Sequence, residues 1–305
     1  MNLFEQTKNI CQLHNIKPSR TKGQNFLINE NVYNKIIESA GLKKDDIVLE
    51  VGPGLGFLTE KLAQNVKKVI AVELDDKLAG LLEKTLATKG IKNVEVVNEN
   101  VLDLDPTLPL PPPIRRAGFV RGGNKTPPPF KGEDWGRYKV VANLPYNITS
   151  IFLRKFLSLE NKPEVMTLML QKEVAERIVA EPGKMSLLAV SVQFFSEPEI
   201  VGCVGSKNFW PEPDVESAII HLRPHLAFPL AKRKEREFEE KDFFRLVKIG
   251  FSSKRKMLKN NLANGYHIKT SEALARIKLA HFSENIRAQE LSVEDWKKLL
   301  PYFLE

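Results

Sequence analysis

The sequence predicts an α/β fold: a parallel sheet covered on both faces by helices, followed by a small helical C-terminal domain. Short apolar runs alternate with amphipathic segments from residue 32 to residue 170, and this alternation is typical of strands connected by helices. After residue 224 the chain becomes strongly charged, with apolar residues at helical spacing. We therefore expect two domains, residues 1–224 and residues 225–305.

The first domain begins with the polar and basic residues 1–30, for which no element is predicted. A helix is expected next, because Val32, Ile36, Ile37 and Ala40 share one helical face. The elements expected after it are strand 47–51, helix 57–64, strand 67–74, helix 75–90 ending at Gly90, strand 93–98, strand 138–144, helix 152–159 and strand 164–170.

Residues 106–137 interrupt this alternation. They are rich in proline, glycine and basic residues, a composition that cannot form a continuous helix or a central strand. We expect an exposed and mostly disordered insertion between the third and fourth strands. Its basic residues could contact nucleic acid, but a solvated loop without function is the more common outcome for such a composition.

The C-terminal domain is predicted to be helical from residue 231 to residue 262. Charged residues dominate this stretch, and its apolar residues recur at a spacing that gives one packing face. That face consists of Phe243, Phe244, Leu246, Val247, Phe251, Met257 and Leu258.

The charge balance and the cysteines limit the class of protein. The chain carries 46 Lys and Arg residues against 38 Asp and Glu residues, a net charge of +8, which favours a polyanionic partner but also serves solubility. Cys11 and Cys203 lack the spacing of a metal or disulfide site. No apolar run is long enough for a signal peptide or a membrane span. We therefore expect a cytoplasmic monomer without a metal.

Three glycines mark a candidate ligand site at the end of the first strand. Gly52, Gly54 and Gly56 lie where this strand gives way to a helix, and glycine permits a sharp turn and the close approach of a ligand. Glu73 ends the second strand about twenty residues later, the spacing typical of a carboxylate that binds ribose hydroxyls. The pair indicates a nucleotide-like cofactor, although a glycine-rich turn by itself also occurs as a purely structural turn.

The spacing within this loop distinguishes between cofactors. The loop has the sequence G-P-G-L-G rather than the G-x-G-x-x-G of NAD sites. Pro53 also removes a backbone donor that a pyrophosphate would use. S-adenosylmethionine has no phosphate, so the loop favours this methyl donor. An NAD-dependent oxidoreductase is less favoured, because no catalytic His–Asp or Tyr–Lys arrangement is evident in the sequence.

A second candidate site, Asn143-Leu144-Pro145-Tyr146, directly follows an apolar strand, at the edge of the sheet where α/β folds bind ligands. Methylation of an adenine N6 amine requires acceptors near its N–H groups, because the amine lone pair is delocalised into the ring. The Asn143 side-chain oxygen and the Leu144 carbonyl can be these acceptors. Pro145 restrains the backbone, and Tyr146 offers a ring on which a flipped base can stack. An ordinary turn is the alternative, since Asn and Pro are common turn residues.

Seven ordered stretches carry a resemblance to a known family. On these motifs the chain resembles the small-subunit ribosomal RNA adenine-N6,N6-dimethyltransferases, the KsgA/RsmA-like family. The resemblance covers most of the chain except residues 106–137, and it implies a Rossmann-like class I methyltransferase sheet. The stretches are KGQNFL at 22–27, LEVGPGLGFLTEKL at 49–62, VIAVELD at 69–75, NLPYNITS at 143–150, LQKEVAERI at 170–178, FWPEPDVESAIIHLRP at 209–224 and FSSKRKMLKNNL at 251–262.

The resemblance also implies roles for single residues. Asn25 and Leu27 would contact S-adenosylmethionine. Gly52 would approach the methionine portion of the cofactor, and Glu73 its ribose. Asn143 would line the catalytic pocket and, like the others, contact the cofactor. In this family the enzyme transfers two methyl groups to N6 of each of two adjacent adenosines in the 3′-terminal hairpin of small-subunit (16S) rRNA. A pre-30S particle is therefore the implied substrate.

One position departs from the family pattern. The family usually has an aspartate after the third strand, which contacts the adenine of the cofactor. The matching position here is Asn100, with Glu99 and Asp103 close by. The asparagine oxygen can still accept a hydrogen bond from the adenine amine, but it carries no charge. We therefore expect that Asn100 binds the cofactor more weakly than the usual aspartate does.

A basic cluster in the C-terminal domain is a candidate RNA contact. Lys254, Arg255, Lys256 and Lys259 lie within six positions of each other, and neutralisation of phosphates by such cations supplies affinity that does not depend on base sequence. A solvated helix face is the alternative interpretation of the same cluster.

Two other functions remain open from the sequence. A large-subunit rRNA adenine-N6 methyltransferase of the macrolide-resistance type would share both the glycine loop and the Asn-Leu-Pro-Tyr motif. A non-catalytic RNA-binding assembly factor on the same fold is the second alternative, and loss of either motif would be its mark. Both motifs are intact.

Overall fold

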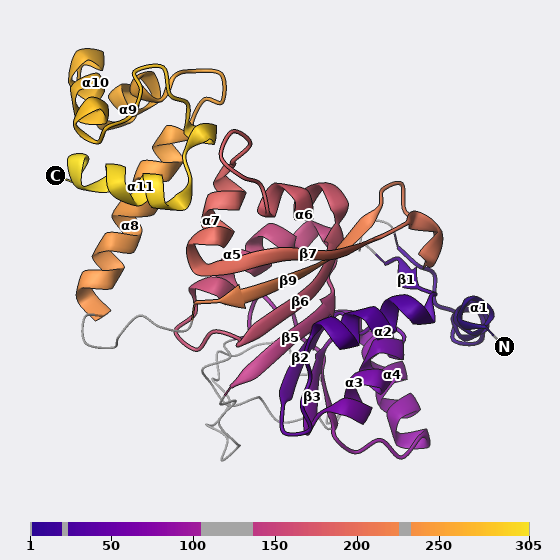
Figure 1. Cartoon of the computed structure of the whole chain (residues 1–305). Coiled ribbons are helices and arrows are strands. Elements are labelled where there is room, and N and C mark those ends of the chain that lie inside the picture. Colours follow the sequence, from indigo (N-terminus) through magenta and orange to yellow (C-terminus); the bar gives the residue numbers. More distant parts are fainter. Residues whose placement is uncertain (1, 20–23, 105–136, 226–232, 305) are drawn as a thin grey trace, which may run out of the picture. The chain divides into compact units, whose positions relative to one another are not determined.

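The computed structural model describes residues 2–19, 24–104, 137–225 and 233–304, with the side chains of 233–239 excepted (Figure 1). These residues form two compact units. The first consists of Met1–Lys172 with Glu199–Pro224, and the second of Glu173–Pro198 with His225–Glu305.

A seven-stranded sheet with the order β4-β3-β2-β5-β6-β9-β7 forms the centre of the α/β fold (Figure 1). The pairs from β4 to β6 are all parallel, as the sequence predicts, whereas β9 runs antiparallel to β6. The antiparallel strand β9 is not among the strands that the sequence analysis predicts. The strands are β2 Ile47–Val51, β3 Lys68–Val72, β4 Val94–Val97, β5 Tyr138–Asn143, β6 Val165–Gln171, β7 Ser196–Val204 and β9 Ser217–Pro224.

The order of the parallel strands determines where a ligand can bind. Counted from β2, the order is that of a doubly wound fold, in which the chain turns back between the first strand and the fourth. Here that point lies between β2 and β5, which pair in parallel with Glu50 opposite Val141. Ligands bind such sheets beyond the carboxyl ends of the strands at this point. This strand order therefore predicts a ligand site directly after Val51 and Asn143.

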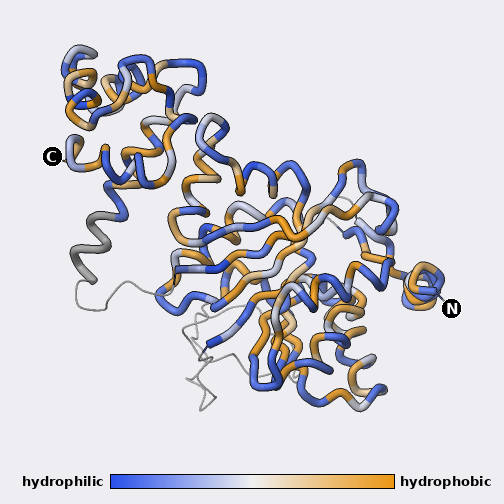
Figure 2. The backbone as a smooth tube through the Cα atoms, in the orientation of Figure 1, coloured by the Kyte–Doolittle hydropathy of each residue, from blue (hydrophilic) through white to orange (hydrophobic). Residues whose placement is uncertain are grey.

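Helices cover both faces of this sheet. One apolar cluster joins α2, α3 and α4 to alternate residues of the strands, among them Val48, Val69 and Val141, and most of the strands are orange in Figure 2. The helix α5 lies behind the strands in Figure 1 and buries Phe152 and Phe156. These helices are α2 Glu30–Ser39, α3 Phe57–Asn65, α4 Asp76–Thr88 and α5 Thr149–Ser158.

Two elements near the N-terminus were not expected from the sequence. The helix α1 (Leu3–Leu13) begins at Asn2, whose side chain accepts a hydrogen bond from the Glu5 N–H in a capping box. The short strand β1 (Phe26–Leu27) pairs antiparallel with β8 (Phe209–Trp210). This pairing brings together segments that are far apart in the sequence, so hydrophobic periodicity could not reveal it.

The second unit is helical and has its own apolar core. It includes residues 173–198, which the boundary expected at residue 224 assigns to the first domain. The reason is packing, because Met185, Ala189 and Val190 lie in the same buried cluster as Leu246 and Trp296. The helices of the second unit are α6 Lys172–Ile178, whose first residue belongs to the first unit, α7 Leu187–Phe195, α8 Arg233–Gly250, α9 Leu258–Tyr266, α10 Thr270–Leu279 and α11 Val293–Leu299.

The expected apolar face of this unit is largely buried. Phe243, Leu246, Val247 and Leu258 are core residues. Phe244 and Phe251 are partly buried against the same cluster, and Met257 is half-buried just before α9.

Two further expectations concern the insertion and the membrane. The predicted insertion at 106–137 lies outside the described residues except for Arg137, which forms an ion pair with Glu164. Within the ranges that the structure describes, no helix is both long and apolar enough to cross a lipid bilayer.

Candidate active site

A cavity of about 330 Å³ lies beyond the carboxyl ends of β2, β3 and β5. This is the place at which a doubly wound sheet binds its ligand. Both candidate sites from the sequence contribute to its wall. The predicted residues that line it are Asn25, Leu27, Gly52, Gly54, Glu73, Asn100, Asn143 and Pro145.

The glycine loop has the backbone conformation that requires glycine. Gly52 has φ +66°, in the left-handed region. A Cβ atom at this position would lie 3.6 Å from the Pro145 ring and 4.0 Å from the Asn143 carbonyl oxygen. The glycine loop and the Asn-Leu-Pro-Tyr motif thus lie next to each other, and a side chain at Gly52 would occupy the space between them.

The Glu73 carboxylate connects the end of β3 to the glycine loop. Its Oε2 accepts a hydrogen bond from the Gly54 N–H at 3.1 Å, and its Oε1 accepts one from the Asp75 N–H at 2.9 Å. Burial raises the pKa of the carboxyl, and these two hydrogen bonds oppose the rise. Both oxygens have lone pairs left for hydroxyl donors that enter the cavity.

Some residues of the Asn-Leu-Pro-Tyr motif line the cavity, and another is buried in the core. Asn143 and Pro145 line the cavity, whereas the Leu144 side chain is buried and its N–H donates to the Met169 carbonyl at 3.2 Å. Pro145 has φ −55° and ψ 128°, after which the short 3-10 helix η1 (Tyr146–Ile148) begins. Asn143 is thus the last residue of β5 to pair with β6, opposite Met169, and the chain leaves the sheet after it.

The Tyr146 hydroxyl is held by a residue that the sequence analysis did not single out. It forms a 2.7 Å hydrogen bond with Ser217 Oγ, the first residue of β9. Ser217 is fully buried and pairs in the sheet with Gln171 at the end of β6. Burial raises the pKa of Tyr146, and the Ser217 hydrogen bond opposes this rise. The phenol ring is therefore anchored at its hydroxyl end.

The segment 25–27 reaches the cavity through the small sheet β1–β8. Leu27 pairs with Phe209, and the Ile28 N–H donates to the Asn208 carbonyl at 2.8 Å. The Tyr33 hydroxyl donates to the Leu27 carbonyl at 2.9 Å. These bonds fix the backbone of Leu27, so that the predicted contacts Asn25 and Leu27 form one wall of the cavity.

Asn100 lies in the turn after β4 and lines the cavity together with Glu99. Its Oδ1 accepts a hydrogen bond from the Leu102 N–H at 3.0 Å, and its carbonyl accepts one from the Asp103 N–H at 2.8 Å. The asparagine thus stabilises its own turn. Its oxygen keeps one lone pair, and its amide keeps two donors, for a ligand.

The charge of the cavity wall indicates the class of ligand. Four carboxylate residues line it, namely Glu50, Glu73, Asp75 and Glu99. Among the described residues no Lys, Arg or His lines it. A wall of this kind disfavours phosphate groups and favours a cation. S-adenosylmethionine carries a sulfonium, an ammonium and a ribose with two hydroxyls but no phosphate, so it fits this set of residues better than a dinucleotide does.

Comparison with known proteins agrees with this geometry. Residues 15–304 match the family described as Ribosomal RNA adenine dimethylase. The chain belongs to this family. The resemblance given by the sequence motifs is therefore confirmed.

Individual members of the adenine dimethylase family match along nearly the whole chain. "Ribosomal RNA small subunit methyltransferase A" of Dehalococcoides mccartyi is 40% identical over 303 residues, which cover 99% of this chain and 94% of that protein. The protein of the same name from Enterococcus faecalis is 36% identical over 300 residues, covering 96% and 93%.

Solved structures confirm the fold of this family member. A dimethyladenosine transferase from Plasmodium falciparum superposes with a TM-score of 0.66 at 27% identity and covers 91% of this chain and 97% of that chain. The 23S rRNA methyltransferase ErmE superposes with a TM-score of 0.65 at 26% identity, covering 91% and 99%. The expected Rossmann-like class I methyltransferase sheet with a helical C-terminal region is thus confirmed.

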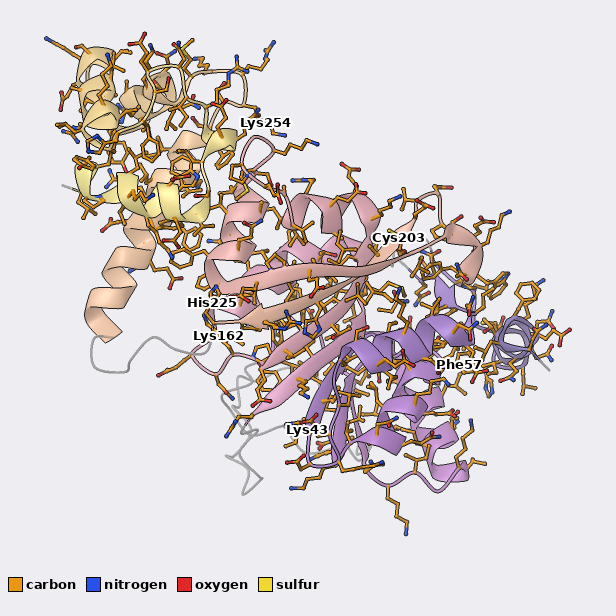
Figure 3. The ribbon with its side chains drawn as sticks, viewed as in Figure 1. Lys43, Phe57, Lys162, Cys203, His225 and Lys254 are labelled. Carbon is orange, nitrogen blue, oxygen red and sulfur yellow. The ribbon has the colours of Figure 1, made fainter. Side chains whose placement is uncertain are left out.

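The predicted RNA-contact cluster lies in the second unit, on the turn between α8 and α9, where Figure 3 labels Lys254. Lys254, Arg255 and Lys256 are exposed, and Lys259 is half-buried at the start of α9. Within the described part of the chain, none of the first three forms an ion pair. Asn261 stabilises the turn. Its Nδ2 donates to the carbonyl oxygen of Gly250 at 2.6 Å and to that of Ser253 at 3.0 Å. The sequence predicts a continuous helix here, but the structure breaks it after Gly250.

Sequence reasoning missed Glu50 and Ser217. Both residues lie inside the stretches that carry the family resemblance. The partner of Ser217, Tyr146, comes from an element far along the chain. The available signal was the presence of a carboxylate in the apolar run IVLEV and of a serine before the apolar run AII. Buried polar residues of this kind need a partner or a function.

Proposed function

We propose that this enzyme transfers methyl groups from S-adenosylmethionine to N6 of two adjacent adenosines in the 3′-terminal hairpin of small-subunit rRNA. The observation that carries the proposal is the single cavity that Asn143 and Pro145 share with Gly52 and Glu73. A methyl donor and a target amine require such a shared space, because the reacting atoms must approach within about 3–3.5 Å.

The residues around the cavity fit the methyl donor in three places. Glu73 offers carboxylate oxygens to the ribose hydroxyls, and Asn100 offers its remaining hydrogen-bonding groups to the adenine. The loop around Gly52, with Asn25 and Leu27 opposite, leaves room for the methionine portion. When it is bound, S-adenosylmethionine supplies an electrophilic methyl group on a sulfonium.

The residues of the Asn-Leu-Pro-Tyr motif act on the target amine. The Asn143 side-chain oxygen and the Leu144 carbonyl accept hydrogen bonds from the two N–H groups of adenine N6. As the N–C bond forms, positive charge develops on N6, and these acceptors stabilise it. The proton leaves N6 for water after the transfer, so no residue of this chain needs to act as a base. The Tyr146 ring, anchored through Ser217, supports the flipped base by stacking.

The RNA substrate is inferred from charge and from the relatives. The net charge of +8 and the exposed cations at 254–256 favour a polyanion. The curated relatives at 35–41% identity carry the name of a small-subunit enzyme, which favours small-subunit rRNA over the large-subunit alternative. We propose that the enzyme acts on a pre-30S particle, as a monomer in the cytoplasm. The proposal includes no metal, and among the described residues no group of His, Cys, Asp or Glu could hold one.

The test is mass spectrometry of ribosomal RNA after incubation with the enzyme and the methyl donor. Pre-30S particles and large-subunit rRNA from a strain that lacks both modifications are the two substrates. We expect N6,N6-dimethyladenosine at two adjacent positions near the 3′ end of the small-subunit rRNA only. Dimethyladenosine in the large-subunit rRNA would favour the macrolide-resistance alternative. Cofactor binding without any methylated product would favour the non-catalytic alternative.

A further inference from the structure

The turn after β4 forms part of the cavity wall but lies outside the sheet. In the described sheet β4 is an edge strand, and its pairing with β3 ends at Val97. Glu99, Asn100 and Val101 follow this strand and line the cavity. Strand pairing therefore does not fix these residues, and the position of this wall depends on the other contacts that the turn makes.

Asn100 forms hydrogen bonds within the turn itself. Its Oδ1 accepts from the Leu102 N–H, and its carbonyl oxygen accepts from the Asp103 N–H. Both bonds join residues of the same turn, so they shape it without attaching it to the rest of the first unit. The side chains of Val101 and Leu104 are buried, but apolar burial is non-directional and does not by itself fix the turn at one place.

One cation on α5 attaches the turn through directional hydrogen bonds. Lys155 Nζ donates to the carbonyl oxygen of Leu102 at 2.6 Å and to that of Leu104. Within the described ranges no carboxylate pairs with Lys155, so its ammonium acts on these two backbone carbonyls. Hydrogen bonds from a charged donor are roughly twice as strong as those between neutral groups. Lys155 therefore holds the last residues of the turn against the helix.

The helix that carries Lys155 is itself firmly placed. Phe152 and Phe156 of α5 are fully buried, and their rings stack with centroids 4.3 Å apart. Lys155 lies between them in sequence and is half-buried. The helix α5 is therefore a rigid support, and the two carbonyls that Lys155 binds are fixed relative to it.

We propose that Lys155 is a positioning residue for recognition of the adenine of S-adenosylmethionine. The inference rests on the proposed function, because it takes Asn100 as the adenine contact. Lys155 does not line the cavity. It acts through the backbone of Leu102 and Leu104, and this attachment keeps Asn100 at the cavity wall. Without the ammonium the turn would occupy other positions, and the apparent affinity would fall with the fraction of molecules in the binding position.

Loss of the Lys155 ammonium should affect only the adenine end of the cavity. Asn143 and Tyr146 are held by β6 and by Ser217, so the methyl-transfer step does not depend on Lys155. Removal of the ammonium should therefore raise KM for S-adenosylmethionine and leave kcat at saturating methyl donor unchanged. It should also weaken discrimination between adenine and hypoxanthine. Hypoxanthine has a carbonyl in place of the exocyclic amine, so it cannot donate to the Asn100 oxygen.

The experiment is calorimetry of the full chain with S-adenosylhomocysteine and S-inosylhomocysteine, two ligands that differ only in the base. Lys155→Met keeps the apolar stem of the side chain but has no donor. We expect its preference for the adenine ligand to fall by about tenfold, the lower range for the loss of a hydrogen bond to a charged group. Lys155→Arg keeps N–H donors and should retain most of the preference. Arg154→Met removes the same charge from the exposed neighbour on α5 and should behave as wild type.

Steady-state methylation of the rRNA gives KM and kcat, and thermal denaturation checks the fold of each variant. If both ligands lose affinity by the same factor, or if kcat falls while the preference stays constant, Lys155 has only a structural role and the proposal is overturned. Equal binding of both ligands by the wild type would also overturn it.

A second variant covers the case in which Lys155→Met does not fold. Lys155→Gln is shorter and neutral but still polar, and it should show the same loss of preference for the adenine ligand. An unchanged preference in this variant would overturn the role of Lys155 equally. Failure of the folded wild type to bind either ligand would instead contradict the proposed function itself.

Discussion

Asn143 owes its place at the cavity to its position at the end of a buried strand. Its backbone pairs with Met169 of β6, and the strand before it is fully buried. The backbone of Asn143 is therefore fixed at the point where β5 ends, and an acceptor in the transition state is most effective when it is placed in advance. Because sheet pairing fixes this backbone, shortening the side chain should leave the course of β5 unchanged.

Asn143→Ala is expected to lower the rate of methyl transfer by roughly 10²–10³-fold, the usual effect of removing one group that stabilises transition-state charge. The dissociation constant for S-adenosylmethionine should change little. Single-turnover transfer of labelled methyl groups measures the first quantity, and calorimetry measures the second. Unchanged turnover in the variant would contradict the role proposed for this oxygen.

Glu73→Gln is expected to weaken binding of S-adenosylmethionine between roughly tenfold and a hundredfold, because hydrogen bonds to a charged group contribute about 1.5–3 kcal/mol. The amide keeps the shape of the side chain but loses the charge and one of the two acceptors that meet Gly54 and Asp75. Calorimetry measures the change, and circular dichroism checks the fold. An unaltered dissociation constant would exclude a ribose contact at Glu73.

The sequence revealed these two residues because each lies at a fixed distance from an obvious neighbour. Glu73 follows the glycine loop at the spacing of a ribose carboxylate, and Asn143 follows an apolar strand. Ser217 and Glu50 carry no such local pattern. The role of Ser217 becomes visible only when the structure shows β9 paired with β6. The position of Glu50 becomes visible only when the structure shows a cavity at the end of β2.

The contact between η1 and β9 is the main link between elements in the site. Tyr146 and Ser217 share one hydrogen bond, so Tyr146→Phe and Ser217→Ala should have nearly the same effect. Each should lower methyl transfer by about fivefold, equivalent to roughly 1 kcal/mol, with little change in cofactor affinity. Because both substitutions break the same bond, the double variant should be no worse than either single one.

The measurement for this link is a double-mutant cycle on kcat and KM for the RNA. Ser158→Ala removes an exposed hydroxyl at the end of α5 and provides a control that should leave both constants unchanged. Additive losses in the double variant would show that the hydrogen bond does not position the ring.

The turn between α8 and α9 depends on one buried side chain. Asn261 is 2% exposed and donates to two carbonyl groups, so Asn261→Ala leaves both without a partner. We expect a loss of about 1–3 kcal/mol in the free energy of unfolding and weaker RNA binding, because the cations at 254–256 lose their support. Asn260→Ala, the exposed neighbour on the same helix, should alter neither. Denaturant titration measures the free energy of unfolding. An equal loss of this free energy in both variants would contradict the role of the Asn261 hydrogen bonds.

The sequence predicted the helices and strands correctly in the part of the chain where each strand is followed by a helix of the same βα unit. The strands and helices from β2 to β6 are confirmed, because each βα unit carries its own periodicity and turn residues. The strands β7 and β9 and the helices α6 and α7 were not predicted. The pairing of β1 with β8 and the packing of α7 on the C-terminal core depend on contacts across long separations, which no local pattern encodes.

In the whole molecule, negative and positive charges gather in different places: carboxylates line the cavity, and the excess of positive charge lies outside it. The candidate cavity is lined by carboxylates among the described residues, although the chain as a whole carries a net charge of +8. The positive excess therefore lies elsewhere, and the exposed turn at 254–256 is one described part of it. A polyanion would be attracted to such surfaces and disfavoured inside the cavity, where a cationic cofactor fits.

This division predicts how salt should affect RNA binding. Each phosphate contact contributes a slope of about 0.7 to 0.9 in a plot of log affinity against log salt. If Lys254, Arg255 and Lys256 contact phosphates, changing all three to Gln should reduce the affinity for small-subunit rRNA and lower the slope by about two units. Affinity for S-adenosylmethionine should stay the same. Fluorescence anisotropy at several salt concentrations measures the slope.

The control for this prediction removes the same amount of charge from another surface. Lys67, Lys84 and Lys92 are exposed positions of the first unit, and changing all three to Gln alters the net charge equally. If only the total charge matters, both triple variants will lose affinity and slope to the same degree. If the turn is a binding surface, the control will keep most of the wild-type slope, because condensed counterions are released only where phosphates are neutralised. Equal slopes in the two variants would therefore assign RNA affinity to the general charge of the molecule rather than to this turn.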